Sequence, residues 1–285
     1  MISKEQFQEE LDLIISNAIR EDVGDGDHSS LACIPKTAKG KAKLLVKDEG
    51  VLAGVDFAKQ VFNYVDKALF VDVEINDGKQ VKYGDIAFYV EGSSQSILKA
   101  ERLVLNAMQR MSAIATKTAF FVDLLKGTGT KILDTRKTTP GIRALEKWAV
   151  TIGGGENHRF ALYDMVMLKD NHIDFAGGIS KAIGMTQNYL RELGKDLKII
   201  VEARNLDEVE EILKSEGVYR ILLDNFSYVD TKKAVARIGD RCLTESSGGI
   251  NEKTIRNYAE CGVDYISSGA LTHSVHNLDL SLKAV

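Results

Sequence analysis

The apolar residues in the second half of the chain fall in short runs, separated by stretches with a helical period. This alternation predicts a parallel sheet, because a crossover helix brings the chain back to begin a neighbouring parallel strand. Six such units within about 150 residues favour a β/α barrel over an open doubly wound sheet. No glycine motif of dinucleotide-binding folds follows the first run, which weakens that alternative. The six runs cover residues 131–135, 164–169, 197–203, 219–224, 241–247 and 264–269.

The first part of the chain has a less regular pattern. A capping-box sequence at 3–6 precedes a stripe of apolar residues with a helical period, which predicts an N-terminal helix. Residues 21–30 contain two glycines and four acidic side chains, and we expect a loop there. Short β-like runs between residues 40 and 90 surround one helical stretch, which is typical of a mixed α/β region. A long, mostly apolar helix is expected over 96–125.

Polar residues share one face of this long predicted helix. Arg102, Asn106, Gln109 and Arg110 follow one another at helical spacing. The pattern by itself favours a solvated face, and a polar site is the alternative.

Almost every predicted strand of the second half ends in charged or small polar residues. In a β/α barrel the carboxyl ends of the strands form the mouth, where the active site lies. One such end is commonly the edge of a core run, but six in succession predict a shared functional mouth. The ends are Asp134 to Lys137, Lys169 to His172, Glu202, Asp224 with Asn225, Glu245 to Gly249, and Ser267 to Gly269.

The last two runs end in serine–glycine sequences. Barrels often hold a phosphate at this place through backbone N–H groups, and glycine lets the backbone approach the anion closely. An ordinary turn is the alternative for either sequence taken alone. The residues concerned are Ser247, Gly248, Gly249, Ser268 and Gly269.

Two carboxylates, Glu202 and Asp224, end successive runs. Such a pair suits Mg²⁺ that is bound through water and completed by phosphate oxygens of a substrate. Salt bridges to neighbouring Lys or Arg are the alternative. His158 and His172 lie in different segments, which argues against a structural zinc site.

Cationic residues are concentrated between residues 136 and 169, although the net charge is −4. Arginine binds carboxylates and phosphates with two parallel hydrogen bonds, and lysine acts as a point charge. This concentration predicts a polyanionic small substrate, while the negative total argues against a general nucleic-acid binder. Three glycines at 153–155 predict a loop that is mobile or closely approached by a ligand. The cationic residues are Arg136, Lys137, Arg143, His158, Arg159 and Lys169.

The location and redox state are expected to be those of a cytoplasmic protein. No run of about 18 apolar residues indicates a membrane span, and the N-terminus lacks the pattern of a secretory signal. Cys33, Cys242 and Cys261 form no CxxC pair, so we expect reduced thiols.

Longer motifs are more specific than these patterns. They are EDVGDGDHSS (21–30), NAMQRMSAIAT (106–116), DTRKTTPGIR (134–143), GGGENHRFALYDMVMLKDNHI (153–173), LLDN (222–225), ESSGGI (245–250) and GVDYISSGALTHS (262–274). These motifs closely resemble the quinolinate phosphoribosyltransferase family, and the resemblance runs in order over most of the chain.

The resemblance implies an α/β fold with two domains. An N-terminal α/β sandwich domain over 1–112, joined by the C-terminal tail 275–285, would accompany an incomplete parallel α/β barrel over 113–274. The resemblance also implies a homodimer in which each sandwich domain completes the active site of the partner, and some members assemble further into hexamers.

The implied reaction transfers a phosphoribosyl group from phosphoribosyl pyrophosphate to quinolinate with decarboxylation. Its products are nicotinate mononucleotide, pyrophosphate and CO₂ in NAD biosynthesis, and it requires Mg²⁺ but no organic cofactor. The positions that match quinolinate-binding residues are Arg136, His158, Arg159, Lys169 and, from the neighbouring subunit, Arg102. Those that match phosphoribosyl pyrophosphate-binding residues are Lys137, Glu202, Asp224, Ser247, Gly248, Gly249, Ser268 and Gly269. Lys137, Lys169, Glu202 and Asp224 are the candidate catalytic residues, Glu202 and Asp224 the candidate Mg²⁺ ligands, directly or through water, and His273 has a supporting role.

The chain departs from the family pattern at Ala113 and Ala161, where members commonly have Gly, and at Ile200, where many carry an additional Glu. These departures concern packing and remove no proposed ligand contact.

Other functions stay open at this point. A nicotinate phosphoribosyltransferase or the molybdenum-locus relative would share the fold, but four cationic positions exceed what a monocarboxylate needs. Lys169 at a strand end also permits a lyase or aldolase that forms a Schiff base. A phosphate-binding protein without turnover is a third class.

Overall fold

The computed structural model describes residues 2–285, which form two compact units. The barrel unit consists of Ile2, Phe120–Arg136 and Gly155–Ala270, and the sandwich unit of Ser3–Ala119, Lys137–Gly154 and Leu271–Val285. The segment 137–154 therefore packs with the N-terminal part of the chain. The predicted domain limits, 1–112 and 113–274, stay a prediction.

A sheet of six parallel strands forms the barrel unit, in the order β6-β11-β10-β9-β8-β7. All six predicted strands and their parallel direction are confirmed. The sheet has β6 and β7 as its two edges, so the predicted fold class, an incomplete parallel barrel with an α/β sandwich, is confirmed as well. The strands are β6 (Lys131–Leu133), β7 (Val166–Leu168), β8 (Ile199–Ala203), β9 (Arg220–Asp224), β10 (Leu243–Ser247) and β11 (Tyr265–Ser267).

These strands form where they do because both of their faces are covered. Every residue of β8 is buried, and so is all of β9 except its last residue. Near-continuous apolar runs are typical of parallel strands with helices on one face and a filled interior on the other. Glu202 and Arg220 are the charged residues that lie buried within these two strands.

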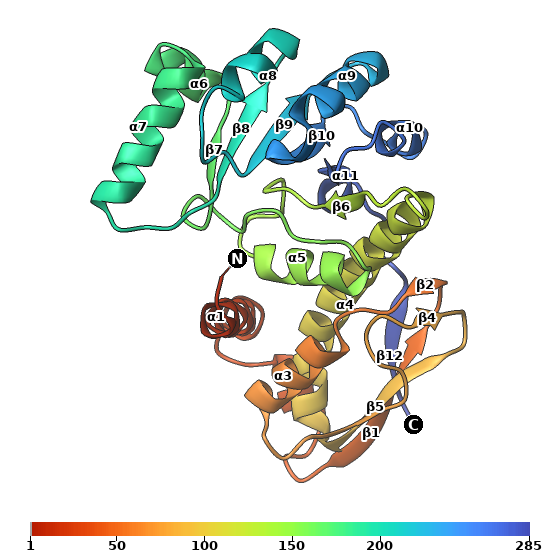
Figure 1. Cartoon of the computed structure of the whole chain (residues 1–285). Coiled ribbons are helices and arrows are strands. Elements are labelled where there is room, and N and C mark those ends of the chain that lie inside the picture. Colours follow the sequence, from red (N-terminus) through yellow and green to blue (C-terminus); the bar gives the residue numbers. More distant parts are fainter. Residues whose placement is uncertain (1) are drawn as a thin grey trace. The chain divides into compact units, whose positions relative to one another are not determined.

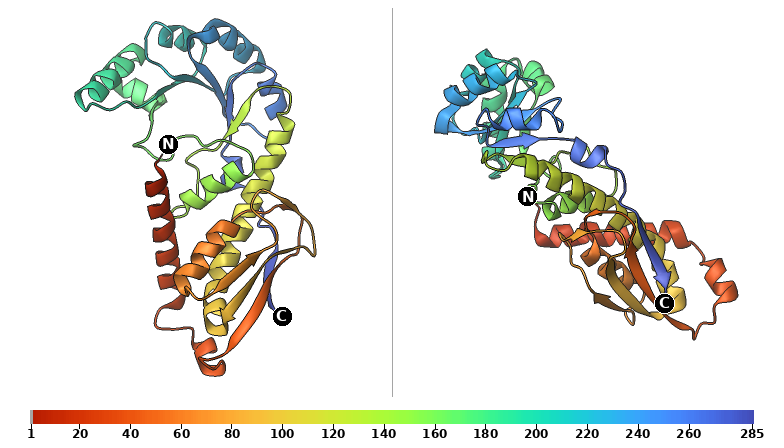
Figure 2. Two further views of the ribbon diagram at one scale, coloured as in Figure 1. Left: turned by 60° about the horizontal axis from the view of Figure 1, so that its bottom comes forward. Right: turned by 90° about the vertical axis from the view of Figure 1, so that its right-hand side faces the viewer.

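The helices of the barrel unit follow the strands along the chain and lie on the outer side of the curved sheet (Figure 1, Figure 2). Asn205 and Ser227 begin two of them by accepting a hydrogen bond from the backbone N–H three residues later. The helices are α6 (Asp170–Ala176), α7 (Ile179–Glu192), α8 (Leu206–Ile212), α9 (Tyr228–Ile238), the 3₁₀ turn η1 (Gly239–Arg241) and α10 (Ile255–Ala259).

One connection of the barrel unit runs from one edge of the sheet to the other. Glu156 pairs in parallel with Leu133 beside β6, and the chain resumes as a strand at Val166 on the opposite edge. Residues 157–165 therefore cross between the edges, and they carry the predicted site residues His158 and Arg159.

An antiparallel sheet in the order β12-β1-β5-β3 forms the sandwich unit, together with a short pair of β2 and β4. The C-terminal strand β12 pairs with β1, so the end of the chain joins this unit. Helix α3 (Val55–Val65) packs against the sheet, with the ring of Phe62 5.9 Å from that of Phe88 in β5. The strands are β1 (Lys39–Val46), β2 (Gly50–Val51), β3 (Phe70–Val73), β4 (Gln80–Val81), β5 (Ile86–Ser93) and β12 (Leu280–Ala284).

The helices of the sandwich unit include the long predicted one, α4, whose end from Phe120 onward belongs to the barrel unit. The capping box predicted at the start of the chain is confirmed, with Ser3 and Gln6 bonding reciprocally. The helices are α1 (Lys4–Val23), α2 (His28–Cys33), α3 (Val55–Val65), α4 (Ser94–Leu124), α5 (Arg143–Ile152) and α11 (Ala270–His273).

The loop expected over residues 21–30 is mostly helical, so this prediction was wrong in part. Helix α1 continues to Val23 and ends at Gly24, whose φ is 53°. Asp27 then accepts a hydrogen bond from the Ser30 N–H and begins α2. Gly24 and Asp27 are helix caps, and cap residues resemble loop residues in composition.

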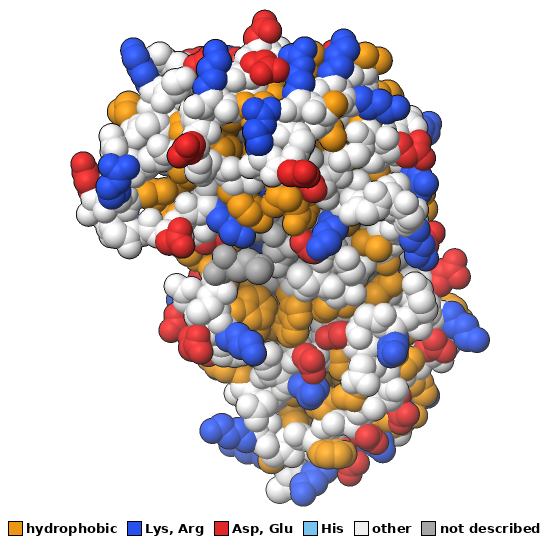
Figure 3. All heavy atoms as spheres, viewed as in Figure 1, with side chains coloured by type: hydrophobic (Ala, Val, Ile, Leu, Met, Phe, Trp, Pro, Cys, Tyr) orange, Lys and Arg blue, Asp and Glu red, His pale blue; other side chains and the backbone are white. Residues whose placement is uncertain are grey.

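The surface carries charges of both signs. On the face drawn in Figure 3, Lys and Arg alternate with Asp and Glu, so this face has no broad basic surface of the kind that nucleic-acid binders use. No helix within residues 2–285 is long and apolar enough to cross a membrane.

Candidate active site

The barrel unit gathers most of the predicted site residues at the carboxyl ends of its strands. Because the strands are parallel, these ends all lie on the same side of the sheet. Lys169 directly follows β7, Asp224 is the last residue of β9, and Ser247 is the last residue of β10. Glu202 is one residue from the end of β8, and Ser268 directly follows β11.

The two carboxylates predicted for ribose and Mg²⁺ are close enough to interact. Burial raises the pKa of Glu202, the Lys169 charge lowers it, and the Asp224 charge raises it. Lys169 Nζ lies 3.6 Å from Glu202 Oε2. Asn225 supports the second carboxylate by donating its side-chain N–H to Asp224 Oδ2 at 2.7 Å. The mouth therefore holds the Lys169 side chain beside the carboxylates of Glu202 and Asp224.

Two guanidinium groups, those of Arg136 and Arg159, lie near each other at the same end of the unit. Arg159 is buried, and its Nη1 donates to the carbonyl oxygen of Met165 at 3.2 Å. Burial, followed by the positive charge of Arg136, lowers the pKa of Arg159, and Asp164 opposes this effect. Two like charges held this close favour an anion that carries more than one negative group.

His158 is buried and contacts protein groups on several sides. Its backbone N–H donates to Asp134 Oδ1 at 2.9 Å, and its Nδ1 accepts the N–H of Arg159 at 2.6 Å. Its Nε2 lies 3.3 Å from Glu245 Oε2. The predicted contact of His158 with quinolinate stays a prediction, and the structure adds that Glu245 fixes the ring from inside the barrel.

Arg220 and Glu245 form a buried ion pair for which the sequence interpretation assigned no role. Arg220 Nη1 lies 2.6 Å from Glu245 Oε2, and its guanidinium lies over the Tyr265 ring at 4.2 Å from the centroid. Burial raises the pKa of Glu245, but bonding and charge from His158 and the charge of Arg220 outweigh it and bring the pKa to about 2. The sequence carried one sign of this pair. Arg220 lies inside the apolar run at 219–224, at the beginning of the strand and therefore away from the predicted mouth.

The first serine–glycine sequence has a backbone that requires glycine. Gly248 has a φ of 93°, and a side-chain carbon there would lie 2.1 Å from Asn225 Oδ1. Gly249 also has a positive φ, but open space surrounds its missing side chain. Ser268, in the second sequence, is buried. The exposed backbone at Gly249 is accessible to a phosphate.

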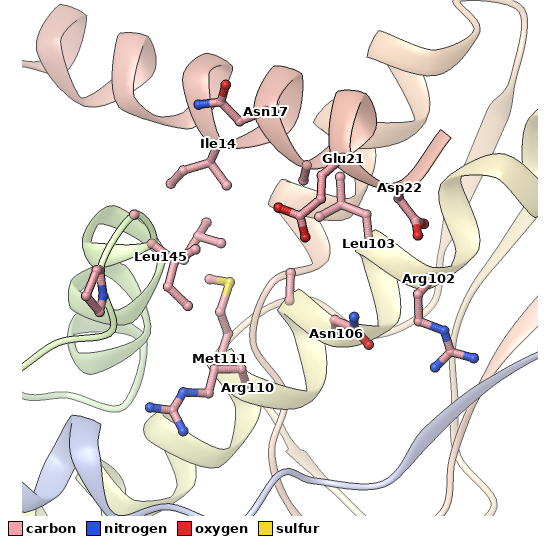
Figure 4. A pocket seen from close by; sticks show the side chains of 15 residues that line it. Ile14, Asn17, Glu21, Asp22, Arg102, Leu103, Asn106, Arg110, Met111 and Leu145 are labelled. Atoms are coloured by element: carbon pink, nitrogen blue, oxygen red, sulfur yellow. The ribbon is translucent and has the colours of Figure 1, made fainter. Parts of the chain in front are cut away.

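Three predicted residues belong to the sandwich unit. Arg102 is exposed on α4 and lines a cavity of about 410 Å³ between α1, α4 and α5, which Figure 4 shows from close by. Lys137 is exposed in the segment before α5. His273 is exposed, with its Nδ1 2.6 Å from the hydroxyl of Ser274.

A metal site with a complete set of protein ligands was not found within residues 2–285, where no three His, Cys, Asp or Glu side chains are arranged to hold an ion. Glu202 and Asp224 fit a Mg²⁺ ion that takes its remaining ligands from water and substrate phosphate, because two neighbouring carboxylates whose charges repel are stabilised by a cation.

Two family models match nearly the whole chain. Quinolinate phosphoribosyl transferase, N-terminal domain, matches residues 27–112, and Quinolinate phosphoribosyl transferase, C-terminal domain, matches residues 114–283. The chain belongs to the quinolinate phosphoribosyltransferase family. The resemblance found in the sequence motifs is thereby confirmed.

Similar proteins of this family occur in plants and bacteria. The chain is 45% identical to "Quinolinate phosphoribosyltransferase [decarboxylating] 1b" of Nicotiana tabacum, over 95% of this chain and 81% of the relative. It is 38% identical to "Nicotinate-nucleotide pyrophosphorylase [carboxylating]" of Mycobacterium leprae, over 99% of both chains. The crystal structure of NadC from Streptococcus pyogenes has a TM-score of 0.89 at 38% identity, and covers 100% of this chain and 99% of its own.

The same fold also occurs in a protein that is named for a different substrate. Human nicotinic acid phosphoribosyltransferase matches with a TM-score of 0.59 at 12% identity, over 96% of this chain and 74% of that one. At this identity the likeness shows the fold alone. The fold therefore cannot distinguish quinolinate from nicotinate as the base, and the distinction rests on family membership and on the cationic site residues.

Proposed function

We propose that this protein is a quinolinate phosphoribosyltransferase of the carboxylating, or nicotinate-nucleotide pyrophosphorylase, type. It transfers the phosphoribosyl group of phosphoribosyl pyrophosphate to quinolinate and releases pyrophosphate and CO₂, giving nicotinate mononucleotide in de novo NAD biosynthesis. The observation that carries the proposal is the match of both family domains along the chain, together with a site that holds the cationic side chains of Arg136, Arg159 and Lys169.

Quinolinate is a dianion, and its two carboxylates match the cationic groups of the site. Arg136 and Arg159 provide two guanidinium forks, and Lys169 provides a point charge. His158 lies between Arg159 and Glu245, and these contacts hold its ring beside the cationic groups. Because phosphoribosyl pyrophosphate is also highly charged, these cations offset the repulsion between the two substrates.

The phosphoribosyl group is assigned to the strand ends β8 to β11. Backbone N–H groups at Gly248, Gly249 and Gly269, with the hydroxyls of Ser247 and Ser268, are the proposed cradle for the 5′-phosphate. Glu202 and Asp224 bind the ribose hydroxyls. Lys137 contacts the pyrophosphate end of the same substrate.

The reaction is a displacement at C1 of the ribose followed by loss of CO₂. The pyridine nitrogen forms a bond to C1 while the C1–O bond to pyrophosphate breaks, and its electron pair leaves with pyrophosphate. Glu202 and Asp224 stabilise the positive charge that develops at C1. The bond to the 2-carboxylate then breaks, its electron pair is stabilised by the cationic ring nitrogen, and that carbon takes a proton. A Mg²⁺ ion held by Glu202 and Asp224, directly or through water, would neutralise charge on pyrophosphate.

A Schiff-base lyase is less well supported. In such a lyase the lysine amine attacks a carbonyl carbon, whereas Lys169 Nζ is engaged in an ion pair, 3.6 Å from Glu202 Oε2.

Assembly as a homodimer with shared active sites belongs to the same proposal. Arg102 supports it, because it is an exposed arginine on α4 beside the cavity of Figure 4 rather than a member of the barrel unit. The neighbouring subunit would receive this guanidinium at its quinolinate site. A cytoplasmic location also stays a proposal, since plant relatives carry the names chloroplastic and mitochondrial.

The test is to incubate the purified protein with phosphoribosyl pyrophosphate, Mg²⁺ and either quinolinate or nicotinate, and to follow nicotinate mononucleotide by chromatography. Product from quinolinate alone is the expected result. Product from nicotinate alone would overturn the assignment of the base. No product from either, with a folded protein, would favour a binding protein without turnover.

A further inference from the structure

The backbone around Lys137 is held in place although its side chain is exposed. The buried hydroxyl of Thr272, in α11, donates to the carbonyl oxygen of Lys137 at 2.8 Å. The next residue, Thr138, accepts a hydrogen bond at its hydroxyl from Arg143 Nε at 3.0 Å. Two successive residues of this segment are therefore fixed by groups from other parts of the sandwich unit.

The third residue of the segment, Thr139, binds a fully buried carboxylate. Glu146 in α5 accepts the Thr139 N–H at 3.0 Å and the Thr139 hydroxyl at 2.8 Å. The same carboxylate accepts Nε and Nη2 of Arg110, in α4, at 3.0 and 2.9 Å. Arg110 Nη2 also donates to the carbonyl oxygen of Thr272. One arginine thus connects α4, α5, α11 and, through Glu146 and Thr272, the segment 137–139.

We propose that Arg110, Glu146 and Thr272 are positioning residues that hold the segment 137–139 for binding of phosphoribosyl pyrophosphate. This inference rests on the proposed function, which assigns Lys137 to that substrate. A lysine side chain has many rotamers, so a fixed backbone reduces the freedom that must be lost when its ammonium group binds a phosphate. A pyrophosphate also carries its charge at defined oxygens, and displacing the backbone would displace the ammonium from them.

The hydrogen bonds of Arg110, Glu146 and Thr272 suit a role in positioning the segment 137–139 better than a role in overall stability. A buried ion pair is weak evidence for stability, because a well-packed apolar pair of similar volume often does as well. An apolar pair could not, however, accept both hydrogen bonds of Thr139 or donate to the carbonyl of Thr272. Those bonds orient the substrate-binding segment.

The sharpest test is Thr272→Val, which removes the hydroxyl bound to Lys137 and keeps the branched shape of the side chain. We expect the dissociation constant of phosphoribosyl pyrophosphate, measured by calorimetry on the full chain, to rise about 3- to 10-fold, the usual effect of losing one hydrogen bond. The KM for phosphoribosyl pyrophosphate should rise in parallel, and more than the KM for quinolinate. Thr272→Ser, which restores a hydroxyl, should bind nearly as well as the unchanged protein.

A matched control is Thr231→Val in α9. Thr231 is equally buried, and its hydroxyl also donates to a carbonyl oxygen, that of Ser227, at 2.8 Å. The Thr231→Val variant should lower thermal stability about as much as Thr272→Val, while the affinities for both substrates stay unchanged. Arg110→Lys, which keeps the charge but loses the fork, should weaken phosphoribosyl pyrophosphate binding at least as much as Thr272→Val.

Equal effects of Thr272→Val and Thr231→Val on binding would overturn the inference, and so would a Thr272→Ser variant as weak as Thr272→Val. The calorimetric measurement needs no second substrate. If the unchanged protein binds phosphoribosyl pyrophosphate but does not turn over quinolinate, the proposed function fails while the positioning inference can still be supported or rejected. If it does not bind phosphoribosyl pyrophosphate at all, both fail.

Discussion

At the scale of single residues, the barrel interior depends on one buried carboxylate. Glu245 is completely buried, and its charge is compensated by Arg220 and by its contact with His158. The pKa of about 2, against the usual 4.5, means that the folded state strongly favours the ionised form. The predicted mouth thus lies above a charged network that the apolar pattern of the strands did not indicate.

We predict that Arg220→Met destabilises the protein by about 3–5 kcal/mol, because it leaves the Glu245 charge buried without its arginine partner. Urea denaturation at neutral pH measures this change. The double variant Arg220→Met/Glu245→Gln should recover part of the loss. A single variant as stable as the unchanged protein would show that the pair contributes little.

The Glu245 carboxylate also makes the stability of the folded state depend on pH. Since the pKa of Glu245 is lower in the folded than in the unfolded chain, its contribution to stability is complete above the usual value of 4.5. It is lost as the pH falls from there toward about 2. The double variant should lack this component of acid destabilisation.

At the scale of elements, the three consecutive glycines at 153–155 show that the same residue type can serve in a loop or in helix packing. The sequence predicted a mobile or ligand-contacting loop at 153–155. For Gly153 this prediction was wrong, because the residue ends α5, is buried and lies against α4. A side-chain carbon there would be 2.5 Å from the carbonyl oxygen of Ala115. This glycine permits close packing of two helices.

We predict that Gly153→Ala lowers the free energy of unfolding by about 1–3 kcal/mol, because the added carbon overpacks the contact with α4. The control is Gly184→Ala in α7, where a side-chain carbon would meet nothing within 4 Å. That variant should raise stability by about 0.5–1 kcal/mol, since alanine favours a helix interior over glycine. Urea denaturation compares the two, and a neutral Gly153→Ala would contradict the packing argument.

At the scale of the whole molecule, the proposed active site needs residues from two subunits. Arg102 and Lys169 are assigned to the same substrate but belong to different units of the chain. In a two-fold dimer, a variant of Arg102 and a variant of Lys169 damage different halves of each site.

We predict that Arg102→Ala and Lys169→Ala each reduce turnover by about 10²- to 10³-fold, as removal of a charge-stabilising group commonly does. Co-refolding equal amounts of the two should restore about one quarter of the normal activity, because half of the dimers are mixed and each mixed dimer has one intact site. Sedimentation checks that the mixture is dimeric. No recovery in mixed dimers would contradict sharing of the site.

The sequence by itself determined where the barrel strands lie along the chain, that they are parallel, and the family. Each strand could be found locally, because a run of apolar residues buried on both faces ends abruptly where polar residues such as Asp224 and Ser247 begin. The motifs around Arg136 and Lys169 were equally local, since the spacing of charged residues within a segment is visible without any fold.

Only the tertiary structure decided which distant groups meet. Nothing in the sequence pairs Arg220 with Glu245, or Arg110 with Glu146 and the segment 137–139, because these contacts join residues from different helices and strands. The cost of burying a charge depends on where its partner lies in space, and that position is fixed only when the elements pack. The sequence therefore determined the chemistry available to this protein, and the packing decided which side chains are free to bind a substrate and which are engaged in holding those in place.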